Sequence, residues 1–373
     1  MRPEPRDWSK LRVFPLAERE SMTTVEDILV QPDSPPPSCS PESAEAARRC
    51  ADAVRRARER GAGVILLYGA HLLRNGAALI LDRLMDQGWL THLATNGAGT
   101  IHDWEYAWLG RSTESVRKNV PTGTFGAWDE TGRFIHLALM AGALRGDGYG
   151  ASLGRFIAED GAGLPSTEEL RALISSEPQH PLTAARADLL QAMISHHLPA
   201  GPVSVTHNWK HASVLASAFR RGVPFTVHPG VGYDIISNHP MFNGAVIGRA
   251  ATTDFRLIGD SVETLDGGVV LSVGSAIMAP QVFEKSLSAV NNLRLIKGRP
   301  IVSGHSIYVI DLQDGGRWDW TQGEPPKTNP AYYLRFCKSF ARMGGEMHYV
   351  QSDNLAFIHN LHFALRQSEG AKP

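Results

Sequence analysis

The stretch Gly61-Ala62-Gly63-Val64-Ile65-Leu66-Leu67-Tyr68-Gly69-Ala70-His71 decides the fold. Its apolar run at 64–67, bounded by glycines, predicts a short strand that is buried on both faces. An amphipathic stretch at 77–87 predicts a helix, and residues 90–94 predict the next strand. Residues 101–109 predict the beginning of a further helix, which follows a glycine-rich turn. This alternation is typical of a parallel sheet covered by helices.

The same alternation continues to the end of the chain. Apolar runs predict further strands at 203–206, 225–227, 269–273, 306–312 and 348–351, with helices at 211–220 and 280–291 between them. We therefore predict an α/β fold, a doubly wound and mostly parallel sheet with Rossmann-like topology, preceded by an N-terminal arm.

Composition changes mark the expected domain boundaries. Residues 1–42 form the arm and end in a proline-rich break at 32–41, where Pro35, Pro36 and Pro37 favour extended structure. A helix at 41–60, capped by Ser40 or Ser43, opens the α/β domain at 43–366, and 367–373 form a tail. The glycine-rich segment 142–163 is expected to be a loop that crosses a site or a subunit boundary.

Composition also excludes several classes of protein. The 373 residues carry a net charge of −1, with 29 Arg but only 8 Lys, and neutrality argues against a general nucleic-acid or polyanionic-membrane binder. Cys39, Cys50 and Cys337 form no metal or disulfide pattern. Without an apolar run of about 20 residues or a signal-peptide core, a soluble cytoplasmic protein is expected.

Polar and glycine residues gather directly after the predicted strands, where doubly wound sheets bind ligands. Glycines at these ends let a backbone approach a phosphate, and a following helix N-terminus supplies N–H donors. No G-x-G-x-x-G fingerprint is present, but consecutive turns of this kind indicate a nucleotide. The clusters are Tyr68–Gly76, Thr95–Glu105, Thr206–His211, His228–His239 and Gly274–Ala276.

The histidines leave a second hypothesis open, a metal-dependent hydrolase or lyase. His102 with Asp103, His207 with His211, and His228 with Asp234 and His239 offer ligand types, although no H-E-x-x-H motif appears. The alternative is that these histidines have a structural role, in which they cap helices or bind backbone carbonyls. Asp234 and Glu105 are candidates for a general base or a ribose partner, with solvated loop carboxylates as the alternative.

At these strand ends the sequence resembles deoxyhypusine synthase, whose NAD-binding fold is shared with the sirtuins. The resemblance spans about residues 59–365. Gly69-Ala70-His71-Leu72-Leu73-Arg74-Asn75-Gly76 looks like the family's Ser-Asn-x-x-x-Ser-Gly turn. Ala94-Thr95-Asn96-Gly97-Ala98-Gly99 and the trailing His102-Asp103-Trp104-Glu105 look like its Thr-Thr-Ala-Gly-Gly turn with acidic residues.

Two later stretches extend the resemblance. Arg220-Arg221-Gly222-Val223-Pro224-Phe225, followed by Pro229 and Asp234, is similar to the family's Ile-Pro-Val-Phe and Pro-Ala-Leu-Thr-Asp. Val273-Gly274-Ser275-Ala276 stands where the family has a glycine run. The family's imine-forming lysine, four residues before an aspartate, corresponds to Tyr349 before Asp353, and its histidine pair is absent. The sequence is thus identified as a divergent member that lacks the catalytic lysine.

The resemblance implies an NAD-dependent transferase or oxidoreductase that acts on a small amine or related metabolite without that lysine, as a homotetramer or dimer. A protein that binds a nucleotide or metabolite without catalysis is the remaining alternative. Lys210 is the one lysine that follows a strand within a polar cluster, where desolvation would lower its pKa. The expected cofactor-binding residues are Gly69, His71, Asn75, Thr95, Asn96, Gly97, Asp103, Glu105, Gly274 and Ser275; the catalytic ones His207, Lys210, Asp234 and Asp353; the substrate-binding ones His228, His239 and Tyr349.

Overall fold

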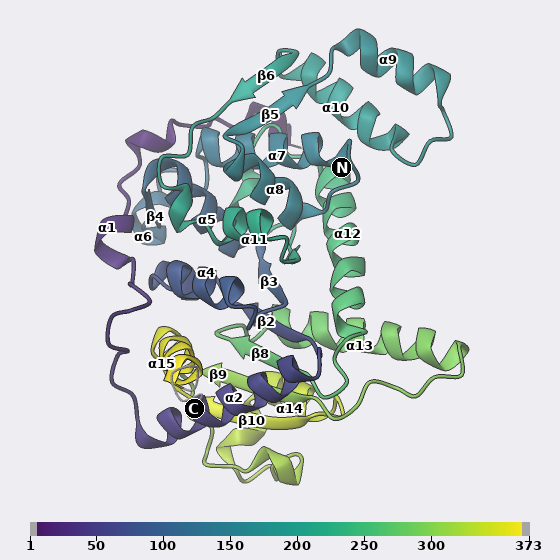
Figure 1. The fold of residues 1–373 in the computed structure, drawn as a ribbon. Helices are drawn as coiled ribbons and strands as arrows, with labels where there is room; N and C mark the ends of the chain where they lie inside the picture. Colours follow the sequence, from purple (N-terminus) through teal and green to yellow (C-terminus); the bar gives the residue numbers. More distant parts are fainter. Residues whose placement is uncertain (1–5, 368–373) are drawn as a thin grey trace, which may run out of the picture. The chain divides into compact units, whose positions relative to one another are not determined.

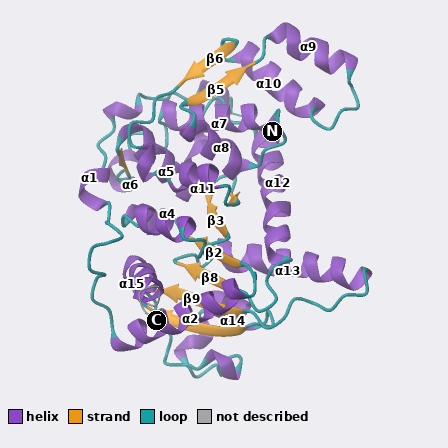
Figure 2. Cartoon of the chain, viewed as in Figure 1, coloured by secondary structure: helices purple, strands orange, loops and turns teal. Residues whose placement is uncertain are grey.

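The computed structural model describes residues 6–367, so the predicted tail lies, from 368 on, outside the described residues. The chain divides into two compact units. The helical unit comprises residues up to 27, 100–220 and 229–254. The sheet unit comprises 28–99, 221–228 and residues from 255 on. Figures 1 and 2 show the elements of both.

The sheet unit is built on six parallel strands in the order β10-β9-β8-β2-β3-β7. Renumbered along the chain, this order is 3-2-1-4-5-6, the Rossmann order, which confirms the predicted fold class. The central strands are continuous apolar runs because helices cover both of their faces. The strands are β2 (Val64–Tyr68), β3 (His92–Asn96), β7 (Phe225–His228), β8 (Val269–Val273), β9 (Ser306–Asp311) and β10 (Glu346–Gln351).

Helices pack on the two faces of this sheet. Alternate strand residues such as Ile65, Leu67 and Val309 join one buried cluster with the helices α13 and α14 and the end of α12. Helices α2 and α15 pack against each other and on the strands. The elements are α2 (Pro41–Glu59), α3 (His71–Arg74), α4 (Ala78–Asp86), α13 (Met278–Ile296), α14 (Arg335–Ala341), α15 (Asn354–Gln367), η5 (Trp320–Gln322) and η6 (Pro330–Tyr333).

The helical unit is held together by a core of large side chains that includes Trp104, Tyr149 and Phe156. Its elements are η1 (Trp8–Lys10), η2 (Leu16–Glu18), β1 (Thr23–Thr24), β4 (Arg111–Ser112), α6 (Val116–Asn119), α7 (Asp129–Ala143), α8 (Tyr149–Ala158), β5 (Gly161–Leu164), α9 (Thr167–Ser176), α10 (Thr183–Ser195), β6 (Gly201–Ser204), η3 (Lys210–Ala212) and η4 (Ile235–Asn238). Helices α1 (Val25–Ile28), α5 (Gly97–Leu109), α11 (Val214–Arg221) and α12 (Gly244–Val262) have residues in both units.

The structure corrects two predictions from the sequence. The expected loop at 142–163 contains helix α8 and strand β5, because its glycines are needed for close packing. A Cβ on Gly142 would lie 1.9 Å from the Ser152 hydroxyl, and one on Gly154 would lie 2.6 Å from the Leu215 carbonyl oxygen. The strand expected at 203–206 is β6, which pairs antiparallel with β5 and does not join the large sheet.

The segment expected to be an arm is ordered against its own chain from residue 6 on. Leu16 and Arg19 are buried in the helical unit, and the Phe14 backbone bridges Trp128. The proline-rich part belongs to the sheet unit, where the Pro37 carbonyl accepts a hydrogen bond from the Asn360 amide. Ser40 caps α2, accepting a bond from the Ser43 backbone N–H. No helix of the described residues is long and apolar enough to span a bilayer.

Candidate functional site

The strand order of the large sheet reverses between β2 and β8, and two glycines meet at that point. The Gly69 N–H donates to the Val273 carbonyl at 3.0 Å, and a Cβ on Gly69 would lie 2.1 Å from the Gly274 carbonyl oxygen. Gly274 has a φ of +58°, and a Cβ there would lie 2.3 Å from the Asn354 amide nitrogen. Only glycines therefore fit, and the carboxyl ends of both strands present bare backbone.

Buried polar groups surround the Gly274 end of this crevice. Ser275 is buried, and its hydroxyl accepts a hydrogen bond from the Ala279 N–H in the first turn of α13 at 3.2 Å. The Asn354 side chain opens α15 after β10 and is 7% exposed. Within residues 6–367 its Oδ1 has no hydrogen-bond partner. An unpartnered buried acceptor favours a ligand that donates a hydrogen bond.

The turn after β2 presents two further expected residues. His71 is the first residue of α3 and Asn75 is its C-cap, and both side chains are exposed. Gly76 closes the turn with a φ of +92°, where a Cβ would collide with the Ile28 carbonyl. This turn therefore holds His71 and Asn75 on the same edge of the sheet as Gly69.

The turn after β3 is shorter, because α5 begins at Gly97 directly after the strand. The Thr95 hydroxyl donates to the Tyr68 carbonyl at 2.9 Å and ties β3 to β2. The Asn96 side chain accepts a bond from the Gly99 N–H at 3.0 Å. Where many dinucleotide folds place a ribose-binding carboxylate after the second strand, this chain carries Asn96.

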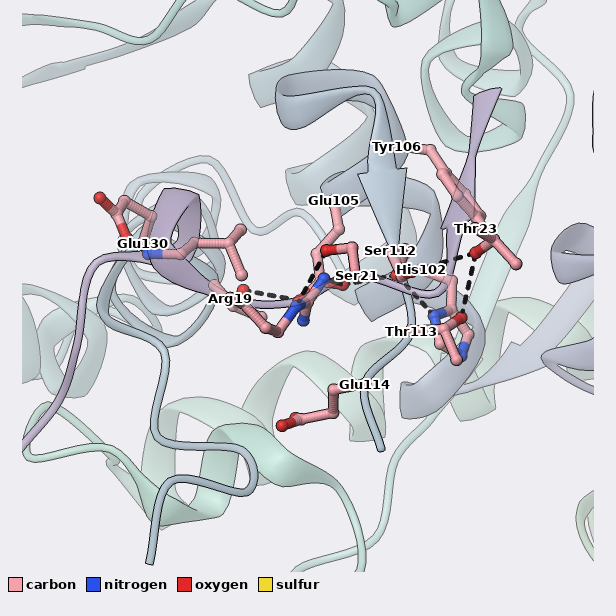
Figure 3. A network of polar contacts seen from close by, with 12 residues as sticks. Arg19, Ser21, Thr23, His102, Glu105, Tyr106, Ser112, Thr113, Glu114 and Glu130 are labelled. Carbon is pink, nitrogen blue, oxygen red and sulfur yellow. Dashed lines mark hydrogen bonds and ion pairs between the residues drawn. The ribbon is translucent and has the colours of Figure 1, made fainter. Parts of the chain in front are cut away.

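Glu105, expected beside a ribose, belongs to the helical unit and lies in a buried polar network (Figure 3). Its carboxylate accepts two bonds from the Arg19 guanidinium, both at 2.8 Å, one from Thr131 at 2.8 Å and one from Ser112. Burial alone raises the pKa of Glu105, but Arg19 and then Ser112 outweigh it and hold the pKa below its usual value. These contacts give Glu105 a structural role.

Asp103, also in the helical unit, caps helix α11. Its carboxylate accepts bonds from the Ser213 hydroxyl and, at 2.7 Å, from the Val214 N–H. Burial raises the pKa of Asp103 to about 7 against these hydrogen bonds. Both the Asp103 and the Glu105 carboxylates already have protein partners. The ribose contacts expected of them remain predictions.

His207 and Lys210 meet at a carboxylate that the sequence did not single out. Lys210 forms an ion pair with Asp160, and the His207 ring Nδ1 lies 3.4 Å from the same side chain. His207 is buried edge-on between Trp104 and Phe156, and burial lowers its pKa to about 4. Among residues 6–367 neither ring nitrogen of His207 has a hydrogen-bond partner, so the ring is held by its aromatic neighbours and Lys210 by its ion pair with Asp160.

The other expected residues of the helical unit also bind neighbours. The Asp234 carboxylate accepts the Gly230 N–H at 2.7 Å. The His239 ring lies 3.3 Å from Asp129, and this contact, ahead of Arg133, keeps the pKa of Asp129 below its usual range despite partial burial. Among residues 6–367, no group of three or more His, Cys, Asp or Glu could hold a metal ion.

The sheet unit contains the last three expected residues. His228 ends β7, lies 3.1 Å from the Thr226 hydroxyl, and has its pKa lowered to about 4 by burial. Tyr349 on β10 donates to the Gln313 carbonyl at 2.5 Å. Asp353 accepts the Ala356 N–H at 2.9 Å and caps α15. Its neighbour Asn354 was not predicted, although its place after a strand and before a helix was a usable signal.

The structure thus brings together one set of expected residues along the carboxyl edge of the sheet. This set consists of Gly69, His71, Asn75, Thr95, Asn96, Gly97, Gly274 and Ser275. These eight residues offer bare backbone, small hydroxyls, amides and the His71 imidazole, and none of the eight is a carboxylate. A set without negative charge suits an anionic ligand better than a cationic one.

No protein-family model matches the sequence, and no curated protein matches it. Among solved structures, the chain is similar to the ternary complex of AgrE with ornithine and NAD+, with 13% identity, a TM-score of 0.45 and coverage of 90% of this chain and 34% of that one. It is similar to ArgZ, an arginine dihydrolase from the ornithine-ammonia cycle in cyanobacteria, with 13% identity, a TM-score of 0.42 and coverage of 90% and 33%.

A third similar structure is a conserved LOR/SDH protein from Methanococcus maripaludis, with 13% identity, a TM-score of 0.41 and coverage of 96% of this chain and 75% of that one. The chain spans about a third of the length of the AgrE and ArgZ chains. The resemblance to deoxyhypusine synthase remains a prediction from the sequence.

Proposed function

We propose that the sheet unit binds NAD in the crevice at the carboxyl ends of β2 and β8. The observation that carries the proposal is the reversal of strand order between these strands, with the Gly69 and Gly274 backbones in contact. Doubly wound sheets bind dinucleotides at this point because the connections leave the two strand ends in opposite directions and open a crevice between them.

The residues at the crevice fit a dinucleotide. Gly69 and Gly274 let the ends of β2 and β8 approach each other closely. The 19-residue helix α13 begins shortly after Gly274, and the positive end of its dipole favours a phosphate there. The unpartnered Asn354 Oδ1 supplies an acceptor for a ribose hydroxyl or an amide. Asn96 in place of a carboxylate makes NADP a necessary second ligand in any test.

NAD, when bound, would supply a nicotinamide ring that exchanges a hydride with a substrate. The finer prediction, a deoxyhypusine synthase-like enzyme that acts on a small amine or related metabolite, is kept as part of this proposal. Tyr349 stands at the position of the family's lysine and cannot form an imine, so a hydride step would not be followed by covalent capture there. The sequence predicts catalytic roles for His207, Lys210, Asp234 and Asp353, and substitution of each residue would test its role.

The experiment measures NAD+ and NADP+ binding by calorimetry to the parent and to Ala70→Asp. Ala70 lies beside Gly69 before α3, is partly exposed, and has α-helical backbone angles that aspartate can adopt without strain. A carboxylate facing a bound pyrophosphate costs about 1–2 kcal/mol at an effective dielectric between protein and water, or about tenfold in affinity. The matched control is Ala184→Asp, in the exposed first turn of α10 in the helical unit.

We expect a dinucleotide to bind the parent and the control equally and Ala70→Asp about tenfold more weakly, with unchanged thermal stability in its absence. Absence of binding by either dinucleotide at millimolar concentration would overturn the proposal, because a ligand of the native state must also stabilise it. Equal affinity of Ala70→Asp and the parent would place the ligand elsewhere.

A further inference from the structure

A cavity of about 900 Å³ lies at the carboxyl end of the edge strand β10, within the sheet unit. Helix α2 contributes one wall, the loop after β9 contributes a second, and the end of β10 contributes the floor. This volume is in the range of pockets that hold cofactor-sized or drug-sized molecules. Its lining includes Ser43, Arg49, Arg317, Trp318, Tyr349 and Gln351.

Most polar side chains of the lining already have partners. The Ser43 hydroxyl donates to Ser352 at 2.7 Å, and the Trp318 indole N–H donates to the Gly323 carbonyl at 2.8 Å. The Tyr349 hydroxyl donates to Gln313, as described above. The Asp319 carboxylate accepts hydrogen bonds from the Thr321 N–H at 3.0 Å, the Thr321 hydroxyl at 2.6 Å and the Gln322 side-chain amide at 3.1 Å. These groups shape the cavity and leave its charge recognition to the arginines.

Arg49 and Arg317 line the cavity, and neither guanidinium has an ion pair or hydrogen bond within residues 6–367. Two other arginines of α2 are paired: Arg48 with Glu45 at 2.7 Å and Arg55 with Asp52 at 2.6 Å. Glu42 also lines the cavity, and its pKa is lowered first by its own backbone N–H, then by Ser40 and Arg317. Two guanidiniums with open donors remain, and such donors favour an anion.

The loop that carries Arg317 is held in an uncommon conformation. Gly316 and Arg317 have φ values of +60° and +51°, and a left-handed arginine costs about 1–2 kcal/mol. The packing around the loop fixes it: a Cβ on Gly315 would lie 2.5 Å from the Tyr349 ring, and one on Gly316 would lie 2.5 Å from the Asn329 side chain. Strain retained in this way is a feature of sites where a side chain is positioned for a ligand.

We propose that this cavity binds a planar anionic metabolite of about mononucleotide size. The two open guanidiniums would take its phosphate or carboxylate group, and the ring surfaces of Trp318 and Tyr349, both partly exposed, would take its flat ring. The site is distinct from the β2–β8 crevice, because β9 and β10 lie beyond β8 in the sheet.

The test measures binding of AMP, adenosine, inorganic phosphate and indole-3-acetate by calorimetry to the full chain. Arg49→Gln keeps a good helix former on α2, and Arg317→Asn keeps a residue that tolerates the left-handed backbone. Arg48→Gln is the matched control, since Arg48 is the adjacent exposed arginine and does not line the cavity. Ala70→Asp tests separation from the dinucleotide crevice.

We expect AMP or indole-3-acetate to bind more tightly than adenosine or phosphate alone, and the tighter of the two identifies the anionic group. Each arginine substitution at the cavity should weaken that probe about tenfold, because each removes a charge-assisted hydrogen bond, while Arg48→Gln and Ala70→Asp should leave it unchanged. The proposal is overturned if neither planar anion binds, if the arginine variants bind like the parent, or if Ala70→Asp alone weakens binding.

Discussion

Arg19→Met would remove the cation from the most deeply buried ion pair of the helical unit (Figure 3). Both side chains are 1% exposed, and the two parallel bonds from Arg19 to Glu105 are 2.8 Å long. The substitution leaves a carboxylate buried with only the hydroxyls of Thr131 and Ser112 as partners. Removing one partner of a buried pair costs about 3–5 kcal/mol.

The dependence on pH separates this explanation from a simple packing defect. In the parent, the lowered pKa of Glu105 contributes stability above the unfolded-state value of about 4.5, and this stability is lost as pH falls through the folded value. Without Arg19, burial raises the pKa, so the charged form opposes folding near pH 7. We therefore expect the deficit to shrink as the pH is lowered towards 4.

The assay is urea unfolding followed by circular dichroism from pH 7 to pH 4, with Lys118→Met as control. Lys118 forms an exposed pair with Glu20, and its loss should cost at most about 1 kcal/mol. Arg19→Met combined with Glu105→Leu should recover part of the loss, because no unpaired charge then remains buried. A deficit below about 1 kcal/mol, or one that does not change with pH, would refute the reasoning.

Two further predictions concern the helical unit. Gly142→Ala should destabilise the helical unit by about 1–3 kcal/mol, because the new methyl group would collide with Ser152. Urea unfolding measures this loss of stability. Unchanged stability would mean that α7 and α8 can move apart without a cost in free energy. His207 should remain neutral down to a pKa of about 4, because burial opposes its charge, so this residue should reduce stability as the pH falls below about 6.5. An NMR titration of its ring checks this, and a midpoint near 6.5 would show that the ring is solvated.

The sequence was informative wherever a local pattern determines the structure. Continuous apolar runs predicted β2 and β8 because both strands are buried on both faces. The glycines at their ends were expected beside a ligand, and the structure shows that they also allow Gly69 and Gly274 to approach each other closely. The signal failed where glycine has a second use: the glycines of 142–163 allow α8 to pack closely, and in the sequence they resemble those of a loop.

Long-range pairing explains the other differences. Glu105 looked available for a ribose because its partner Arg19 lies 86 residues away, in a segment that reads as an arm. Asp160, which joins His207 and Lys210, lies 50 residues before Lys210. The Asn354 position next to Gly274 depends on α15 returning to the sheet, which no local pattern shows.

Hydrogen–deuterium exchange with and without NAD+ tests the dinucleotide site most directly, because it reports where a ligand protects the backbone. We expect NAD+ to slow exchange in peptides that cover residues 66–76 and 272–280, at the ends of β2 and β8, and to leave α9 and α10 unchanged. Exchange that does not change at either strand end, while NAD+ protects another part of the chain, would contradict the assignment of the β2–β8 crevice.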